Sequence, residues 1–471
     1  MRQLFKTPNR NEILHGPALR TMAKIGFPAV LSSIVFTFYN LADAAWLGRL
    51  PEKGAAALAA IQISWPFVWA ILAFVMGFGG AAVTALVAQH LGAGQPREAN
   101  YAMNQLFTVA VISGFVLGAA GYIATPWMVS RLVADSSVAA EVAVYLRVIF
   151  LGLPTMMLPS LFGAVLAAAG DTVTPLLING GGTIVNVFLD AALILGWGTI
   201  PRMGIFGAAI ATVISQGIAT IAFLALFRKG FAGLRLDRQA LRLKWKWVTQ
   251  ALRIGFPAGA GSMLVALGFV VLMWIIGQLD SGKYALAGYG AADRIFGLLF
   301  IATNGLGVGL TTMIGQALGA DMPDRARELM KKGVRALFVI LIVETLVVFA
   351  FRTSLIAFFL PYEPDAIREG TRFIELFAVG MPLLGVFFAA EAVYRGSGWN
   401  VPLTLVGILR LVIRLGLGWL LAFQWGMQSD GIWIGMSLSN VVCGLISIPF
   451  LLSRRWMRPR IQTDSPQETE A

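Results

Sequence analysis

The sequence has little of what disulfide frameworks, metal centres and soluble surfaces need. Its 471 residues include one cysteine, Cys443, and two histidines, His15 and His90. One cysteine excludes a disulfide framework, and so few cysteines and histidines exclude a Cys/His metal cluster. Charged residues make up only 13% of the chain, against roughly 25% in soluble domains. These shortages favour a membrane protein over a soluble or metal-dependent one.

The sequence also lacks the motifs of nucleotide binding and of hydrolysis. The glycine-rich stretches near Gly114, Gly180 and Gly305 do not continue to the lysine and Ser/Thr of a phosphate-binding loop. They favour close helix contacts instead. No cluster of His, Cys and acidic residues has the composition of a hydrolytic centre. We therefore expect neither an enzyme nor an ATP-driven pump, and we expect no cofactor.

Long apolar stretches are what the chain has instead. Hydrophobic residues make up 58% of the sequence, and its mean hydropathy is +0.77. A transmembrane helix needs roughly 20 apolar residues. The sequence therefore predicts an all-α polytopic membrane protein with twelve transmembrane helices. The predicted spans are residues 26–48, 56–88, 101–123, 138–168, 174–197, 204–227, 254–278, 284–318, 334–352, 367–394, 401–424 and 431–452.

The net charge of +12 follows the membrane pattern rather than forming a basic face for nucleic acid. Lys and Arg gather before residue 26, in the connector 229–253 and after residue 453, whereas the alternate loops hold scattered charges. This asymmetry predicts that both termini and the connector are cytoplasmic. The first 24 residues have no apolar core for a cleaved signal peptide. Residues 454–471 are predicted as a disordered cytoplasmic tail.

The chain also repeats itself at an offset of about 228 residues. Residues 25–29 recur at 254–258, and residues 89–96 recur, with substitutions, at 316–323. Six spans in each half give both halves the same orientation, so we predict two six-helix lobes related by a parallel repeat. Such repeats are typical of secondary transporters, which bind substrate between the lobes. The predicted lobes are residues 1–228 and 254–453.

Two aspartates lie inside otherwise apolar spans of the first half, Asp43 in the first span and Asp190 in the fifth. A carboxylate in hydrocarbon is costly, so it marks an ion path or a substrate site. Asn40 precedes Asp43 by three residues and Asn186 precedes Asp190 by four, so each pair shares a helix face. Their oxygens fit a proton or a small hard cation. The competing interpretations are a helix-end aspartate for Asp43, a salt bridge from Asp190 to Arg202, and interhelical hydrogen bonding for the asparagines.

The second half carries charges of its own inside its spans. Arg410 and Arg414 lie one turn apart and share a helix face. The interpretation that we prefer pairs them with Glu344, Glu375 or Glu391, because buried charges are usually paired. The alternative is an anion-binding patch in the cleft.

Several segments resemble motifs of the multidrug and toxic compound extrusion (MATE) family. Residues 39–50 closely resemble the first-helix signature of that family. Further segments that look like family motifs are 168–175, 186–190, 204–212 and 395–402. The likeness covers residues 20 to 453, and acids concentrated in the first half resemble the DinF-like branch. The equivalent second-half positions, near Val270 and Leu417, are not acidic, which departs from the sodium-coupled NorM-like pattern.

The resemblance implies a cation site in the amino-terminal lobe. The binding residues that it implies are Asp43, Asp190, Asn186, Asn40, Tyr39 and Thr212. Pro28 matches the proline at which the first helix bends when the acid changes protonation. A buried acid keeps its proton near neutral pH, which favours a proton as the coupling ion. Sodium, the other ion considered, would bind at Asp43, Asp190 and Asn186.

The function that we predict is a cation-coupled antiporter, driven by protons rather than sodium, that exports organic cations, drugs or other amphipathic compounds by alternating access. The alternative is a flippase for a lipid-linked oligosaccharide or another lipid, for which Arg410 and Arg414 are the supporting residues. We expect small amphipathic or cationic substrates and membrane lipids as partners, and no nucleic acid. The protein is expected to act as a monomer in the bacterial inner (plasma) membrane.

Overall fold

The computed structural model describes most of the chain and shows a helical protein. The described residues are 7–47, 50, 54–132, 136–197, 199–237 and 240–458. Within these ranges the β-type pairing consists of one isolated bridge between Phe231 and Leu234, and the remaining regular structure is helical. The predicted all-α fold class is confirmed.

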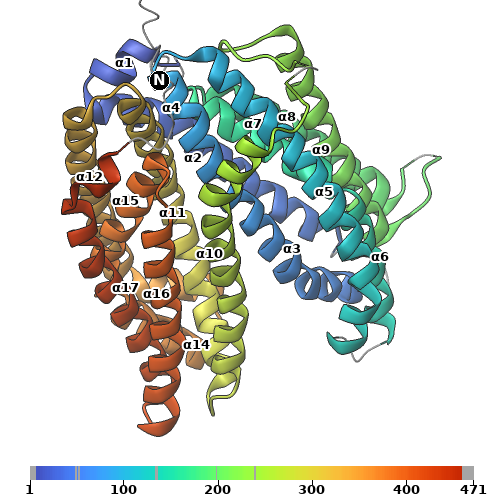
Figure 1. The fold of residues 1–471 in the computed structure, drawn as a ribbon. Helices are drawn as coiled ribbons and strands as arrows, with labels where there is room; N and C mark the ends of the chain where they lie inside the picture. Colours follow the sequence, from blue (N-terminus) through green and yellow to red (C-terminus); the bar gives the residue numbers. More distant parts are fainter. Residues whose placement is uncertain are drawn as a thin grey trace, which may run out of the picture.

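The first half of the chain supplies the helices drawn from blue to green in Figure 1. Helix α3 continues through a π-helical turn, η1, into α4, so the three form one long rod. The elements are α1 (Arg10–His15), α2 (Ala18–Leu47), α3 (Gly54–Val83), η1 (Thr84–Ala88), α4 (Gln89–Gly92), α5 (Pro96–Leu132), α6 (Ser136–Leu151), α7 (Leu153–Ala168), α8 (Val173–Leu195) and α9 (Gly204–Lys229).

The second half repeats this order in the helices drawn from yellow-green to red. A short helix, α13, has no counterpart among the described helices of the first half. The elements are α10 (Trp245–Gly277), α11 (Gly282–Gly319), α12 (Pro323–Ala350), α13 (Arg352–Phe359), α14 (Pro364–Ala378), α15 (Met381–Ser397), α16 (Val401–Trp419), η2 (Leu420–Gln424), α17 (Gln428–Leu452) and η3 (Arg454–Met457).

Ten of these helices are long and apolar enough to cross a membrane, and two bent pairs bring the number to twelve. The pairs are α6 with α7, bent by 51°, and α14 with α15, bent by 61°. Pro154 and Pro382 occupy the first turn of α7 and α15, where a residue without an amide hydrogen starts a new helix easily. The twelve predicted spans are therefore matched, although two of them are broken.

The two lobes lie close together at the end that carries α1 and α4, called here the α1 end, and diverge toward the opposite end (Figure 1). Glycines allow the contact at the α1 end. A Cβ added to Gly92 would lie 2.1 Å from the carbonyl oxygen of Gln316, and one added to Gly319 would lie 1.9 Å from that of Gln89. In each lobe a glycine thus packs against the backbone of a glutamine in the other lobe, as expected for a two-fold repeat.

The same exchange continues along the interface between the lobes. Helix α2 packs against α11, where a Cβ on Gly26 would lie 2.7 Å from the Gly305 carbonyl oxygen. Helix α10 packs against α3, where a Cβ on Gly259 would lie 2.8 Å from the Phe74 carbonyl oxygen. The first long helix of each half therefore contacts the second long helix of the other half.

Several helix ends differ from the predicted spans. Helix α2 begins at Ala18 and α10 at Trp245, each about two turns earlier than the predicted spans, because their charged first turns extend a helix beyond its apolar part. Residues 454–457, predicted to lie in the tail, form the 3-10 helix η3. Trp456 is fully buried there and donates its indole hydrogen to the Leu451 carbonyl at 3.0 Å, which fixes the turn. The tail beyond residue 458 lies outside the described residues.

Candidate ion and substrate sites

One face of α8 carries two of the predicted site residues and packs against α9. Gly182, Asn186, Asp190 and Ile194 are buried and four residues apart, so they form one stripe along the helix. A Cβ on Gly182 would lie 3.5 Å from the Ser215 carbonyl oxygen of α9, which shows that the stripe faces that helix. Asn186 and Asp190 have no exposed surface. The structure therefore places a carboxyl and an amide together inside the first lobe.

Thr212, the third predicted residue of this group, lies at almost the same depth on α9. It is buried, and its carbonyl accepts the Ser215 hydroxyl at 2.9 Å. A Cβ on Gly207 would lie 2.6 Å from the Leu193 carbonyl oxygen, which sets the register of the two helices. Asp190 lies three residues from Leu193, and Thr212 lies five residues from Gly207. At roughly 1.5 Å per residue, the depths of Asp190 and Thr212 along the two helices therefore differ by about 3 Å.

Arg202 does not supply the polar contacts of this group. Asn186, Asp190 and Thr212 each take part in polar or electrostatic contacts within the protein. The exposed Arg202 donates from Nε to the Leu195 carbonyl at 2.9 Å and makes no ion pair within the described part of the chain. The salt bridge considered for Asp190 is therefore not formed with this arginine.

The backbone of α2 brings Asp43 to the level of Asp190. The Thr172 hydroxyl donates to the Ile25 carbonyl at 2.6 Å, which sets the start of α8 beside α2, and the two helices pack along each other. Asp43 lies 18 residues beyond Ile25, and Asp190 lies 18 beyond Thr172. Both spacings correspond to about 27 Å of helix. The structure does not describe the side chains of Tyr39, Asn40 and Asp43.

Pro28 lies within α2, which continues through it as one helix. Proline has no amide hydrogen, so the Lys24 carbonyl loses its helical donor, and the Thr172 hydroxyl reaches the next carbonyl, that of Ile25. The start of α8 that carries Thr172 is held by Asp171, whose carboxylate accepts the amide of Val173 at 2.9 Å. The turn before α8 thus supports α2 next to its proline.

The second lobe repeats this support. The Asn400 side-chain amide donates to the Ile254 carbonyl at 3.3 Å, three residues before Pro257 of α10. Asn400 corresponds to Thr172 in the repeat, and the two lie in the similar segments 395–402 and 168–175. The similarity of these two segments is the sequence signal that points to this support.

Two glutamines join the lobes at the α1 end by equivalent hydrogen bonds. Gln89 donates from Nε2 to the Gly396 carbonyl at 3.1 Å, and Gln316 donates from Nε2 to the Ala168 carbonyl at 2.8 Å. Both carbonyls lie at the carboxyl ends of helices, α15 and α7, where helical donors run out. We call these two hydrogen bonds the glutamine latch. Both glutamines are visible in the sequence as equivalent positions of the repeat, but no local pattern indicates which carbonyls they bind.

A cavity of about 290 Å³ lies where α3 of the first lobe meets α10, α15 and α16 of the second. Its walls include the aromatic rings of Trp69, Phe269 and Phe387. An adjoining smaller pocket shares Phe269 and Arg410 with the cavity and reaches Arg414. The two hollows together form what we call the arginine cavity. It is bounded by both lobes, as a transport site must be if it is to couple to their motion.

The arginines of α16 do not pair with the glutamates that the sequence offered. Glu391 pairs with Arg395 at 2.5 Å, one turn along its own helix. Glu344 has a buried Oε2 without a hydrogen-bond partner in the described structure. The Arg410 guanidinium lies over the Phe387 ring instead, 4.9 Å from its centroid.

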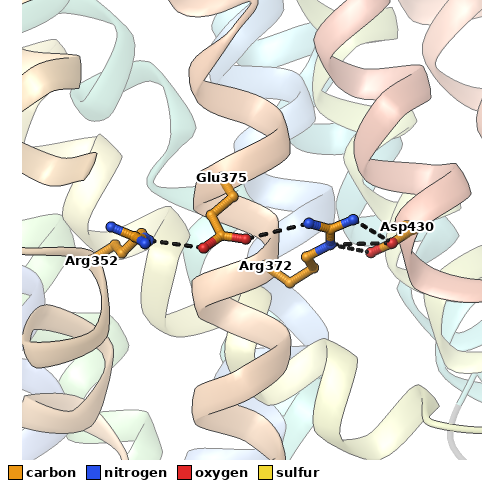
Figure 2. A network of polar contacts seen from close by, with 4 residues as sticks. All are labelled: Arg352, Arg372, Glu375 and Asp430. Atoms are coloured by element: carbon orange, nitrogen blue, oxygen red, sulfur yellow. Dashed lines mark hydrogen bonds and ion pairs between the residues drawn. The ribbon is translucent and has the colours of Figure 1, made fainter. Parts of the chain in front are cut away.

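The third candidate, Glu375, belongs to a separate network near the opposite end of the second lobe. Figure 2 shows Glu375 between Arg352 and Arg372, with ion-pair distances of 2.9 and 3.4 Å. Arg372 also binds Asp430 through Nη2 at 2.9 Å. The preferred interpretation of Arg410 and Arg414 was therefore wrong, because Glu375 and Glu391 form ion pairs with other arginines and Glu344 forms none in the described structure.

Comparison with known proteins agrees with this architecture. The profile of the MatE family matches residues 28–192 and 257–420, one segment in each lobe and together more than half of the chain. A probable multidrug resistance protein NorM of Thermotoga maritima is 25% identical over 449 residues, 94% of each chain. An FAD transporter of Shewanella oneidensis is 25% identical over 457 residues, covering 96% of this chain and 98% of its own.

Solved structures share the fold. A multidrug resistance MATE family transporter of the MOP superfamily, in an outward-facing conformation, superposes with a TM-score of 0.86 at 20% sequence identity. The match covers 95% of this chain and 98% of the other. Two six-helix lobes related by a parallel repeat are thereby confirmed.

Proposed function

This chain belongs to the MatE family of membrane transporters, and from that premise we propose that it is a cation-coupled antiporter that exports amphipathic organic compounds, organic cations and drugs among them. We propose the proton as the coupling ion and the inner (plasma) membrane of a bacterium as its location. The protein would act as a monomer with lobes at 1–228 and 254–453, the connector 229–253 between them, and a cytoplasmic tail. Its assignment to the DinF-like branch stays a prediction.

The observation that carries this proposal is the buried carboxyl group of Asp190. It lies on a face shared with Asn186 and opposite Thr212, with no exposed surface. A carboxyl group is costly to bury in a membrane protein unless it serves an ion or a proton. The matching depth of Asp43 on α2 would let one cation or proton act on both helices.

The mechanism follows from the position of this group between α2 and α9. Protonation of Asp43 and Asp190 from outside would change the packing of α2, would bend that helix at Pro28, and would release substrate outward. Return of the proton to the cytoplasm requires the lobes to part at the α1 end. That step breaks the glutamine latch, so the latch would set the balance between the two states.

The proposal of small organic substrates, apart from their charge, rests on the arginine cavity and on the relatives. Relatives are named for multidrug resistance and for FAD transport. The cavity joins an aromatic wall to a few polar groups, which is the usual composition of sites for small organic molecules. We do not propose the lipid-linked oligosaccharide flippase, because none of these relatives is named for that activity.

Exchange of the two acids tests the proposal. Asp43→Asn and Asp190→Asn should each abolish proton-driven export of ethidium from proteoliposomes, and the double variant should be no worse, because residues that act as one unit are not additive. Asp324→Asn is the matched control, since Asp324 is an exposed aspartate at the start of α12. Undiminished export by well-folded Asp190→Asn protein would refute the proposal.

A further inference from the structure

The arginine cavity contains more positive than negative charge. Three arginines, Arg395, Arg410 and Arg414, line its two hollows, and Glu391 is the one acidic residue that does so. Glu391 is already paired with Arg395 at 2.5 Å. The remaining two arginines therefore face the cavity without a carboxylate partner in the described structure.

Arg414 is the more deeply buried of the two. Its exposed fraction is 7%, and Nη2 donates to the Asn440 side-chain oxygen at 3.1 Å. Its Nε has no hydrogen-bond partner among the described residues. Asp293 of α11 attracts Arg414 electrostatically but forms no ion pair with it in the described structure. A neutral amide thus occupies one side of this guanidinium, and the rest of its hydrogen-bonding capacity is unused.

Arg410 lies one helical turn away, at the boundary shared by the two hollows. Glu391 attracts Arg410 electrostatically. Arg410 nevertheless makes no hydrogen bond or ion pair with the described residues, and its guanidinium lies over the Phe387 ring. Arg414 similarly lies 5.7 Å from the centroid of the Phe269 ring. These rings hold the guanidinium groups in place while leaving their N–H edges available.

A buried charge is costly unless an opposite charge or several hydrogen bonds compensate it. Two such groups, one turn apart and aimed at one cavity, repel each other until an anion enters. Arginine binds carboxylate and phosphate oxygens through pairs of parallel N–H bonds, which is the chemistry that this site lacks. The aromatic wall beside it fits the apolar body of the same ligand.

We infer that the arginine cavity is a binding site for the carboxylate or phosphate group of an amphipathic anion, held by Arg410 and Arg414 with its apolar body against Trp69, Phe269 and Phe387. As a substrate site this inference rests on the proposed transport function. It adds to that function a second class of cargo: compounds that carry an anionic group in addition to, or in place of, the cationic one.

The position of Trp69 connects this site to transport. Trp69 belongs to α3 of the first lobe, whereas the arginines belong to α16 of the second. A ligand that spans the cavity therefore touches both lobes and is released when they move apart. A purely structural role for the arginines would not require the opposite lobe to close the site.

A charge series of one molecular shape tests the inference on the purified full-length protein in detergent. Naphthalene-2-carboxylate, its neutral carboxamide and 2-naphthylmethylammonium are titrated by isothermal calorimetry. The carboxylate should bind at least about tenfold more tightly than the carboxamide, because ion pairs that are freed from water are strong, and the ammonium should not bind at this site. Equal affinity for carboxylate and carboxamide in the wild type would overturn the inference, whatever the variants do.

Variants assign the effect to the arginines. Arg410→Gln should reduce carboxylate affinity to about that of the carboxamide, and Arg410→Lys should fall between, since lysine keeps the charge without the paired donors. Arg147→Gln is the matched control: Arg147 is exposed, lies over the Tyr122 ring at 5.6 Å, and is far from the cavity in the sequence and on the other lobe. Equal losses in the Arg147 and Arg410 variants would contradict the assignment.

Competitors separate the sources of the anion. Displacement of the carboxylate by phosphatidylglycerol in mixed micelles would assign the site to a lipid headgroup and keep the inference. Displacement by inorganic phosphate alone at equal concentration would refute the part played by the aromatic wall. Proton-driven ethidium export is measured on the same preparation. If ethidium is exported but the carboxylate binds no more tightly than the carboxamide, this inference alone is overturned. If the carboxylate binds more tightly but ethidium is not exported, the proposed function alone is overturned.

Discussion

The glutamine latch should decide how often the lobes separate at the α1 end. Gln89 and Gln316 are 0% and 2% exposed, and each caps a helix-end carbonyl of the opposite lobe. Leucine has nearly the same volume as glutamine but no donor. The pair Gln89→Leu and Gln316→Leu therefore removes both hydrogen bonds while filling the same space.

The magnitude follows from burial. Each substitution leaves one carbonyl oxygen, of Gly396 or of Ala168, without its donor while the lobes are in contact, at a cost of about 1–3 kcal/mol. Water restores the hydrogen bond when the lobes part, so the cost falls on the closed arrangement alone. The double variant should lose at least roughly 2 kcal/mol of that preference, a shift of about thirtyfold in the ratio of the two states.

Spin labels can measure this shift. Arg97 and Asp324 are equivalent exposed positions beside the latch, one in each lobe, and Cys443→Ser gives a background without cysteine. Double electron–electron resonance should show one short distance between labels at 97 and 324 in the wild type. A longer distance should become prominent in the double variant, while thermal unfolding changes little, because the latch joins lobes rather than stabilising either one.

A well-folded double variant whose distance distribution is the same as that of the wild type would refute this reasoning. Thr249→Val serves as control, because the Thr249 hydroxyl also donates to a backbone carbonyl, that of Trp245, but within one helix and at the exposed surface. Its distance distribution should match that of the wild type. A longer distance in the control would show that the labels report general loosening.

Two further predictions concern the same end of the molecule and its orientation. Gly319→Ala places a Cβ 1.9 Å from the Gln89 carbonyl oxygen and should also lengthen the label distance, whereas Gly290→Ala meets nothing within 4 Å and should not. In intact cells, a cysteine at Lys283 should react with a membrane-impermeant maleimide and one at Lys246 should not; the reverse result would contradict the positive-inside assignment.

The sequence allowed the helical architecture to be predicted because apolar length and charge placement act locally along the chain. Twelve spans and the two-fold repeat followed from runs of about 20 residues and from motifs such as 25–29 and 254–258. Pro154 and Pro382 were visible, but a proline in the first turn can begin a helix or break one. The bends of 51° and 61° depend on how the halves pack.

The site was predictable only in part. Asn186 and Asp190 share a helix face by spacing alone, whereas their position opposite Thr212 depends on the register of α8 and α9, which no local pattern encodes. The partners of Arg410 could not be chosen from sequence, since several glutamates were equally available. Glu391 forms its ion pair with Arg395 of its own helix rather than with an arginine of α16. Long-range pairing of charges is a property of the packed lobes.

The central claim is that a buried carboxyl group in the first lobe couples a proton to export. Proteoliposomes loaded with ethidium, under a proton gradient or a sodium gradient imposed separately, test it most directly. Export should follow the proton gradient in the wild type and should be lost in Asp190→Asn, with the sodium gradient alone giving none. Export driven by sodium alone, or proton-driven export that survives Asp190→Asn, would contradict the account.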